Sequence, residues 1–114
     1  MNRIFPLMLV FLSACYSTPE IDGFDAASWE HSKLTCKDNR LSHAELLVSQ
    51  QEKLLGEGQA EIKTLLGQPT EHELYNRNQK FFYYSLIADD DCIAKRLSVR
   101  FDALDRVKEI RIIQ

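Results

Sequence analysis

The sequence has little of what marks fibrous, disordered or nucleic-acid-binding chains. It contains only four glycines and three prolines, and 45% of its residues are hydrophobic, which is typical of an ordered globular protein. Lys and Arg number 14 against 17 Asp and Glu, so the basic excess that attracts nucleic acid is missing. A chain of 114 residues accommodates one domain, and we expect no nucleic-acid partner.

The motifs of common enzymes and metal sites are missing as well. There is no Gly-x-Ser-x-Gly, no phosphate-binding Walker loop, no His-Glu-x-x-His and no Cys-x-x-Cys. His31, His43 and His72 are scattered, which favours surface or capping roles over a zinc site completed by a cysteine. The Asp89 to Asp91 run lacks the spacing of an EF-hand calcium loop and predicts a solvated turn. We therefore expect no enzyme, no catalytic residues, no metal and no cofactor.

The N-terminus carries a short apolar run that predicts an export signal. Arg3 supplies the positive start, residues 4–12 form the apolar run, and Ser13 and Ala14 are the small residues that precede a cleavage site. The run is too short to span a bilayer. We expect residues 1–14 to be a signal peptide.

Residues 12–15, Leu-Ser-Ala-Cys, resemble the lipobox of bacterial lipoproteins, in which the cysteine becomes the acylated first residue of the mature chain. The resemblance implies palmitate and further acyl chains on Cys15, which together make an effectively permanent membrane anchor. Tyr16 stands where an Asp would resemble the inner-membrane retention signal, so the outer membrane and its periplasmic face are favoured. An ordinary signal peptide, or a buried cysteine in a short helix, is the alternative.

Two cysteines remain once Cys15 is lipidated, and an even number in an oxidising compartment favours a disulfide. We predict that Cys36 and Cys92 pair, which stabilises the fold by about 4 kcal/mol in the chain-entropy model. Two buried free thiols are the alternative.

The stretch after the lipobox has no hydrophobic period, so residues 15–28 are predicted to be the lipidated N-terminus and a tether. The folded domain is expected over residues 29–114. Aromatic residues at the junction, Phe24 and Trp29, are expected to dock on the domain.

The segment from Gly58 to Pro69 predicts a short helix between two breakers. Its apolar residues at positions 62, 65 and 66 share one face, Gly58 is an acceptable N-cap, and Gly67 stands where helices end in a left-handed residue. An earlier helix is expected to start at Ser42, where Ser42 to Glu45 fits the capping box, and to end at Gly56. The short connector predicts a helical hairpin.

Beyond Pro69 the hydrophobic period becomes two, which predicts strands over residues 71–76, 80–87, 96–101 and 107–112. Asp102 to Asp105 is the predicted hairpin turn. In the last strand the alternation of apolar residues is interrupted by one residue between Val107 and Ile110, which predicts a bulge. The fold class is therefore α+β, with a two-helix hairpin packed on a three- to four-stranded antiparallel sheet.

One face of the third predicted strand is expected to be solvent-exposed and basic, because Arg96 and Arg100 alternate with apolar residues. Two of the four aromatics from residue 81 to 84 must also point away from the core. We predict that Arg96, Arg100, Phe82 and Tyr84 form a patch for a partner protein or anionic lipid. The alternatives are that the arginines pair with nearby carboxylates and that the Trp29 segment covers the aromatics.

These features together resemble the BamE (SmpA/OmlA) family of outer-membrane lipoproteins. The resemblance covers about residues 54–112 in addition to the lipobox, and it rests on Gly58, Leu65-Leu66-Gly67-Gln68-Pro69, Tyr83-Tyr84, Leu97-Ser98-Val99-Arg100-Phe101, Val107 and Ile110. It implies a small α+β domain that accompanies the machinery inserting β-barrels into the outer membrane, with barrel-assembly proteins and anionic phospholipid as partners.

The expected function is that of an outer-membrane-anchored, non-enzymatic lipoprotein that binds protein or lipid and supports β-barrel assembly. The alternative is a periplasmic inhibitor or binding module of the same fold, similar to the β-lactamase-inhibitory proteins, in which an exposed loop would block an enzyme's cleft.

Overall fold

The strands of the protein form one antiparallel sheet in the order β1-β2-β3-β4, so each strand pairs with its neighbour in sequence. The computed structural model describes residues 19–74 and 80–114. Its elements are α1 (Ala26–His31), α2 (Leu41–Ser49), the 3-10 helix η2 (Gln51–Lys53), α3 (Gln59–Leu66), β1 (Glu71–Leu74), β2 (Lys80–Ile87), β3 (Lys95–Phe101) and β4 (Val107–Ile113). The predicted α+β class is confirmed, with α1 as an additional helix.

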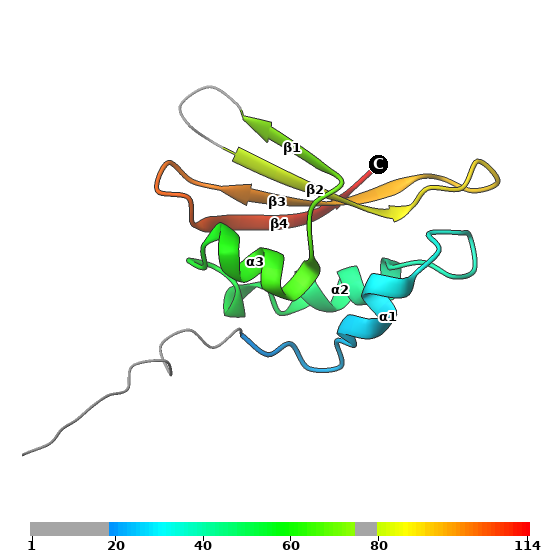
Figure 1. Ribbon diagram of the computed structural model, residues 1–114, viewed down its shortest axis with the longest axis horizontal. Helices are drawn as coiled ribbons and strands as arrows, with labels where there is room; N and C mark the ends of the chain where they lie inside the picture. Colours follow the sequence, from blue (N-terminus) through cyan, green and yellow to red (C-terminus); the bar gives the residue numbers. More distant parts are fainter. Residues whose placement is uncertain (1–18, 75–79) are drawn as a thin grey trace, which may run out of the picture.

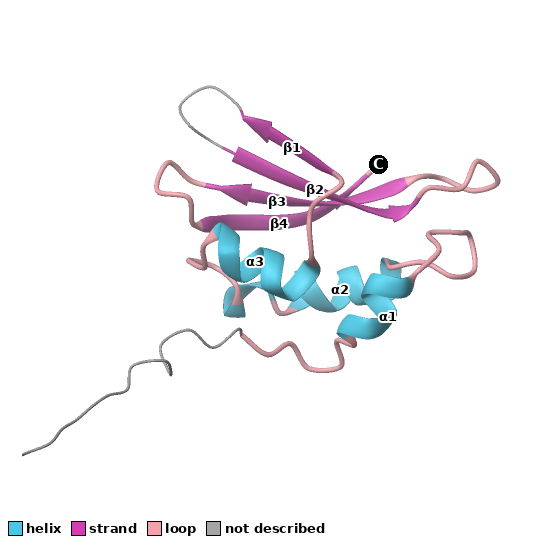
Figure 2. Cartoon of the chain, in the orientation of Figure 1, coloured by secondary structure: helices cyan, strands magenta, loops and turns pink. Residues whose placement is uncertain are grey.

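The helices lie together on one side of the sheet (Figure 1). Figure 2 shows them in cyan beneath the magenta strands, and none of the described helices covers the opposite side. The core fills the space between these two layers. Its fully buried side chains include Leu47 and Ile62 from the helices and, from the strands, Phe82, Tyr84, Leu97, Val99 and Phe101.

Helix α3 forms as the sequence predicts. Gly58 is its N-cap, and the helix ends at Leu66 because Gly67 adopts a φ of 84°, in the left-handed region that favours glycine. Ile62 and Leu66 are buried against the rest of the core, whereas Leu65 is only partly buried.

Two aromatic side chains bind the carbonyl groups at the C-terminal end of α3. The Trp29 indole Nε1 donates to the Leu66 carbonyl at 2.9 Å, and the Tyr84 hydroxyl donates to the Gly67 carbonyl at 2.8 Å. Burial raises the pKa of the Tyr84 phenol, so the hydroxyl keeps the proton that it donates. The last carbonyls of a helix lack partners within the helix, and these two bonds attach α3 to α1 and to β2.

The N-terminal boundary of the folded region was predicted too late in the chain. Ile21 is only 7% exposed and belongs to the core, and α1 begins at Ala26 with Asp25 as its N-cap. Ile21 and Phe24, both within the expected tether, are therefore packed on the core of the domain. Phe24 and Trp29 dock as predicted.

The start of α2 also differs from the prediction. The helix begins at Leu41, and Asn39 Oδ1 accepts from the Leu41 amide at 3.0 Å, so no capping box forms at Ser42. The Arg40 amide donates to the Leu86 carbonyl of β2 at 3.2 Å, which fixes the point where the chain turns into α2. A tertiary contact thus overrides the local capping signal. The helix also ends earlier than predicted, at Ser49.

The β3–β4 hairpin matches the prediction in both its turn and its bulge. Asp102 Oδ1 accepts from the Leu104 amide at 2.9 Å and the Arg106 amide at 3.1 Å, and Asp105 has a positive φ of 63°. The β3–β4 register shifts between Arg100 and Phe101, which leaves Lys108 as an extra residue in β4.

The free edge of β4 is partly covered by the connection between α2 and α3. Val107 exchanges backbone hydrogen bonds with Gly56 and Glu57 at 2.9 and 2.8 Å. Farther along the strand, the Ile110 amide donates to Gln51 Oε1 at 3.1 Å. These contacts remove donors and acceptors that would otherwise pair with another strand.

The predicted disulfide is present. Cys36, between α1 and α2, is bonded to Cys92, between β2 and β3, and their Cα atoms lie 6.0 Å apart. The bond connects the helical layer to the sheet at the end of β2.

Replacement of Leu66 by alanine is expected to lower the free energy of unfolding by about 2–5 kcal/mol, because the leucine is buried in the core. Leu65→Ala is the matched control and is expected to cost less, since Leu65 is only partly buried. Urea unfolding of both variants measures the difference. Equal losses would contradict this orientation of α3.

The pKa of Asp102 is lowered, mainly by the hydrogen bond from the Arg106 amide. Its contribution to stability is therefore fully present above the ordinary aspartate pKa of 3.8 and is lost as the pH falls through the lowered folded-state pKa. An asparagine at position 102 can accept the same bonds without a charge. The stability difference between wild type and Asp102→Asn is expected to be largest at neutral pH and to shrink in acid.

Urea unfolding from neutral pH down to about pH 2 measures this difference. The exposed Asp90, converted to Asn, serves as the control for a charge change in a loop. A difference between wild type and Asp102→Asn that stays constant with pH would contradict the assignment.

Candidate interaction surface

The face of the sheet opposite the helices carries arginine and aromatic side chains from adjacent strands. We define the outer face by Phe81 and Tyr83 of β2 and Arg96, Ser98 and Arg100 of β3. Phe81 pairs with Arg100 across the β2–β3 ladder, and Tyr83 pairs with Ser98. Side chains directly opposite in an antiparallel pair project to the same side, so these residues form one continuous surface.

The two aromatic rings of the outer face stack on each other and on an arginine. The centroids of Phe81 and Tyr83 are 5.8 Å apart with an interplanar angle of 8°. The Arg96 guanidinium carbon lies 4.5 Å from the centroid of the Tyr83 ring, which is a cation–π distance. Neighbouring side chains leave Tyr83 only 8% and Ser98 only 6% exposed. The centre of the face is therefore an ordered, closely packed layer.

Carboxylates from the edge strands balance the arginines. Arg96 forms an ion pair with Glu71 of β1 at 2.9 Å, and Arg100 forms one with Glu109 of β4 at 3.4 Å. Both arginines thus have acidic partners. This agrees with the alternative expectation that the arginines pair with nearby carboxylates. The surface was predicted to be basic, and the pairing with Glu71 and Glu109 makes it close to neutral instead.

An open hollow lies at the β1 side of the outer face. It has a volume of about 500 Å³, and its lining includes Glu71, Glu73, Tyr83 and Arg96. The Tyr83 hydroxyl donates to Glu73 Oε1 at 2.9 Å, so one wall is held by a charge-assisted hydrogen bond. The hollow presents both donors and acceptors to an incoming group.

Phe82 and Tyr84, the aromatics predicted for the patch, point into the core instead. Both are fully buried, and they pair across the ladder with Val99 and Leu97, which also face the helices. Strand alternation then places the other two aromatics, Phe81 and Tyr83, beside the arginines. The prediction was wrong by one residue in register.

The acidic partners of the arginines were missed in the sequence. Glu71 and Glu109 are separated from Arg96 and Arg100 along the chain, and only strand pairing brings them together. In β1, the alternation of Glu71 and Glu73 with His72 and Leu74 was the available signal. Cys15 and the predicted signal peptide lie outside the described residues.

Comparison of the chain with protein-family models, with curated proteins and with solved structures finds no significant match. Within residues 19–74 and 80–114, every helix is too short to cross a membrane.

The orientation of β2 is tested by alanine substitution of two adjacent aromatics. Phe82→Ala is expected to lower the free energy of unfolding by about 3–5 kcal/mol, because it empties a site in the core. Phe81→Ala removes the same side chain from the outer face and is expected to cost clearly less. Thermal and urea unfolding measure both effects. A larger loss of stability for Phe81→Ala than for Phe82→Ala would contradict this orientation, because it would indicate that Phe81 is the residue in the core.

Proposed function

We propose that this protein is a lipoprotein of the outer membrane, anchored through Cys15, that acts by binding another protein with the outer face of its sheet. It is a binding protein rather than an enzyme. The single observation that carries the proposal is that the described helices all lie on one side of the sheet (Figure 1). The arginine and aromatic side chains of the outer face project from the other side.

The membrane address comes from the sequence. The apolar run over residues 4–12 and the Leu-Ser-Ala-Cys that follows it resemble a lipoprotein signal, and Tyr16 favours the outer membrane over the inner one. The Cys36–Cys92 disulfide supports an oxidising compartment such as the periplasm.

The balance of charge on the outer face favours a protein partner over anionic lipid. Arg96 and Arg100 are within ion-pair distance of Glu71 and Glu109, so a negatively charged headgroup would have to compete with carboxylates already in place. Aromatic rings and arginine are the side chains most enriched at protein interfaces. The partly buried Phe81, stacked on Tyr83, supplies an apolar contact beside these charges.

The process served by this binding is β-barrel assembly in the outer membrane. This step rests on the resemblance to the BamE family, carried by Gly58, by residues 65–69 and by the β2 and β3 sequences. The α+β architecture and the helix that ends at Gly67 are compatible with that resemblance.

The proposal predicts that Arg96→Glu combined with Arg100→Glu lowers partner binding by at least about tenfold, because four carboxylates would then face one another across the sheet. The protein and its variant are captured from mildly solubilised membranes, and the co-purifying barrel-assembly proteins are quantified. Binding to phosphatidylglycerol vesicles is measured in parallel.

Lys33→Glu with Lys37→Glu is the matched control, since both lysines are exposed and lie outside the sheet. It makes the same change in net charge and is expected to leave co-purification unchanged. Wild-type co-purification by the arginine variant would contradict the proposed surface. Loss of vesicle binding alone would show that the surface binds lipid, and capture of a hydrolase instead of assembly proteins would favour an inhibitor.

A further inference from the structure

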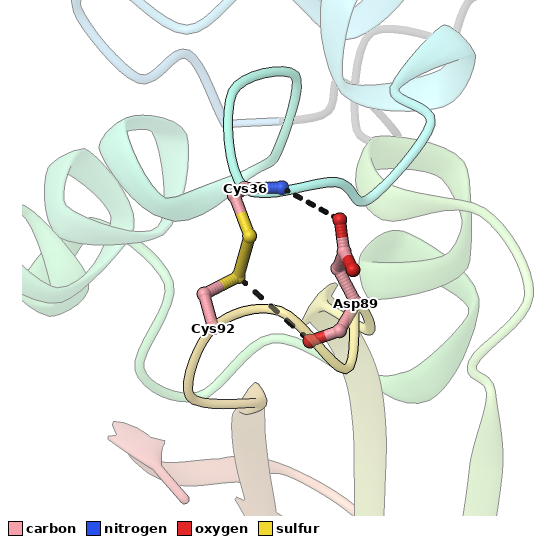
Figure 3. A group of neighbouring side chains, drawn as sticks. All are labelled: Cys36, Asp89 and Cys92. Carbon is pink, nitrogen blue, oxygen red and sulfur yellow. Dashed lines mark hydrogen bonds between the residues drawn. A yellow bond between two sulfur atoms is a disulfide. The ribbon is translucent and has the colours of Figure 1, made fainter.

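Three potential metal ligands meet at the end of the molecule where the disulfide lies. The Cys36 and Cys92 sulfurs and a carboxylate oxygen of Asp89 all lie within 4.8 Å of one another. Figure 3 shows the Asp89 side chain beside the pair of cysteines, with its carboxylate directed at the backbone of Cys36. Two sulfurs and one oxygen form a donor set that divalent zinc accepts.

Hydrogen bonds connect the α1–α2 loop, which contains Cys36, to the end of β2 and the start of the loop that contains Cys92. These bonds are independent of the disulfide. The Ala88 amide donates to the Leu34 carbonyl at 2.8 Å, and the Arg40 amide donates to the Leu86 carbonyl at 3.2 Å. One bond precedes Cys36 in the α1–α2 loop and the other follows it. When the sulfur–sulfur bond is broken, these contacts keep Cys36 opposite Cys92.

The Asp89 carboxylate is positioned by two backbone groups. Its Oδ1 accepts from the Asp91 amide at 3.0 Å, and its Oδ2 accepts from the Cys36 amide at a longer 3.4 Å. The first bond orients the carboxylate, and the second is weak enough for Oδ2 to exchange the amide for a cation. Exposed carboxylates at Asp90 and Asp91 add negative charge to the approach.

The geometry points to a second state of this site: in the reduced protein, Cys36, Cys92 and Asp89 bind one zinc ion. A dithiol reductant supplies two electrons and two protons, the sulfur–sulfur bond breaks to give two thiols, and the reductant closes to its own disulfide. Zinc then displaces the two thiol protons into solvent, and water fills the fourth position. The same two cysteines thus make a covalent link when oxidised and a metal site when reduced.

The required movement is small. Zinc–sulfur bonds of about 2.3 Å in a tetrahedral site place the two sulfurs roughly 3.8 Å apart. Both cysteines are in loops, Cys36 is exposed, and Cys92 and Asp89 are half-buried. Rotation of the cysteine side chains separates the sulfurs, and the exposed side gives the ion a path of entry.

The test uses the full chain with Cys15→Ser, so that Cys36 and Cys92 are its only thiols. The protein is reduced with dithiothreitol, freed of reductant without air, and titrated with Zn²⁺ against a chromophoric chelator. One zinc per chain is expected for the reduced protein and none for the oxidised protein. Titration with Cd²⁺ is expected to produce the ultraviolet charge-transfer band of a thiolate complex.

Asp89→Asn is expected to weaken zinc binding by at least about tenfold, because it removes the anionic ligand. Asp90→Asn makes the same charge change in the same loop and is expected to alter the affinity by less than about threefold. Failure of the reduced protein to bind zinc, or equal affinities for the two variants, would overturn the site. Binding that persists unchanged in denaturing urea would also overturn it, since an unfolded dithiol would then be responsible.

Discussion

The buried indole of Trp29 is the contact on which the arrangement of the helices depends. Trp29 is 1% exposed, and its Nε1 donates a hydrogen bond to the last carbonyl of α3. The centroid of its ring lies 6.0 Å from that of Tyr84 and 4.5 Å from the guanidinium carbon of Arg40. Arg40 Nε in turn donates to the Trp29 carbonyl at 2.7 Å, and its Nη1 donates to the Ser85 carbonyl at 3.2 Å. One cluster therefore joins α1, α3, the start of α2 and β2, and burial accordingly lowers the pKa of the Arg40 side chain.

Because this cluster gathers the described helices on one side, the sheet has two chemically different faces. The inner face is apolar, whereas the outer face is a layer of stacked aromatics and paired charges. The β4 edge is occupied at Val107 and Ile110 by the α2–α3 connection, so part of it cannot receive an added strand. The outer face is the surface that the proposed function assigns to a protein partner, and the disulfide secures the sheet to the helices behind it.

Much of the fold could be predicted from local signals, and the errors occur where distant contacts decide. Gly58 and Gly67 delimit α3 because a cap and a left-handed residue are local requirements, and the bulge in β4 follows from parity within one strand. The side to which Phe82 points depends on pairing with β3, and a second bulge between Ser85 and Ile87 interrupts the alternation farther along β2. The ion pairs of the outer face depend on strand order in the same way, which is why the neutral balance of charge was missed.

The proposed function requires that the outer face contacts a protein in the intact cell. A photoreactive phenylalanine analogue at Phe81 tests this contact, because it preserves an aromatic side chain on that face. The same analogue at the exposed Leu55, in the α2–α3 connection, is the control. Irradiation is predicted to give one discrete protein adduct from position 81 and none of that mass from position 55. Adducts with lipid alone, or the same protein adduct from both positions, would contradict the proposed interaction surface.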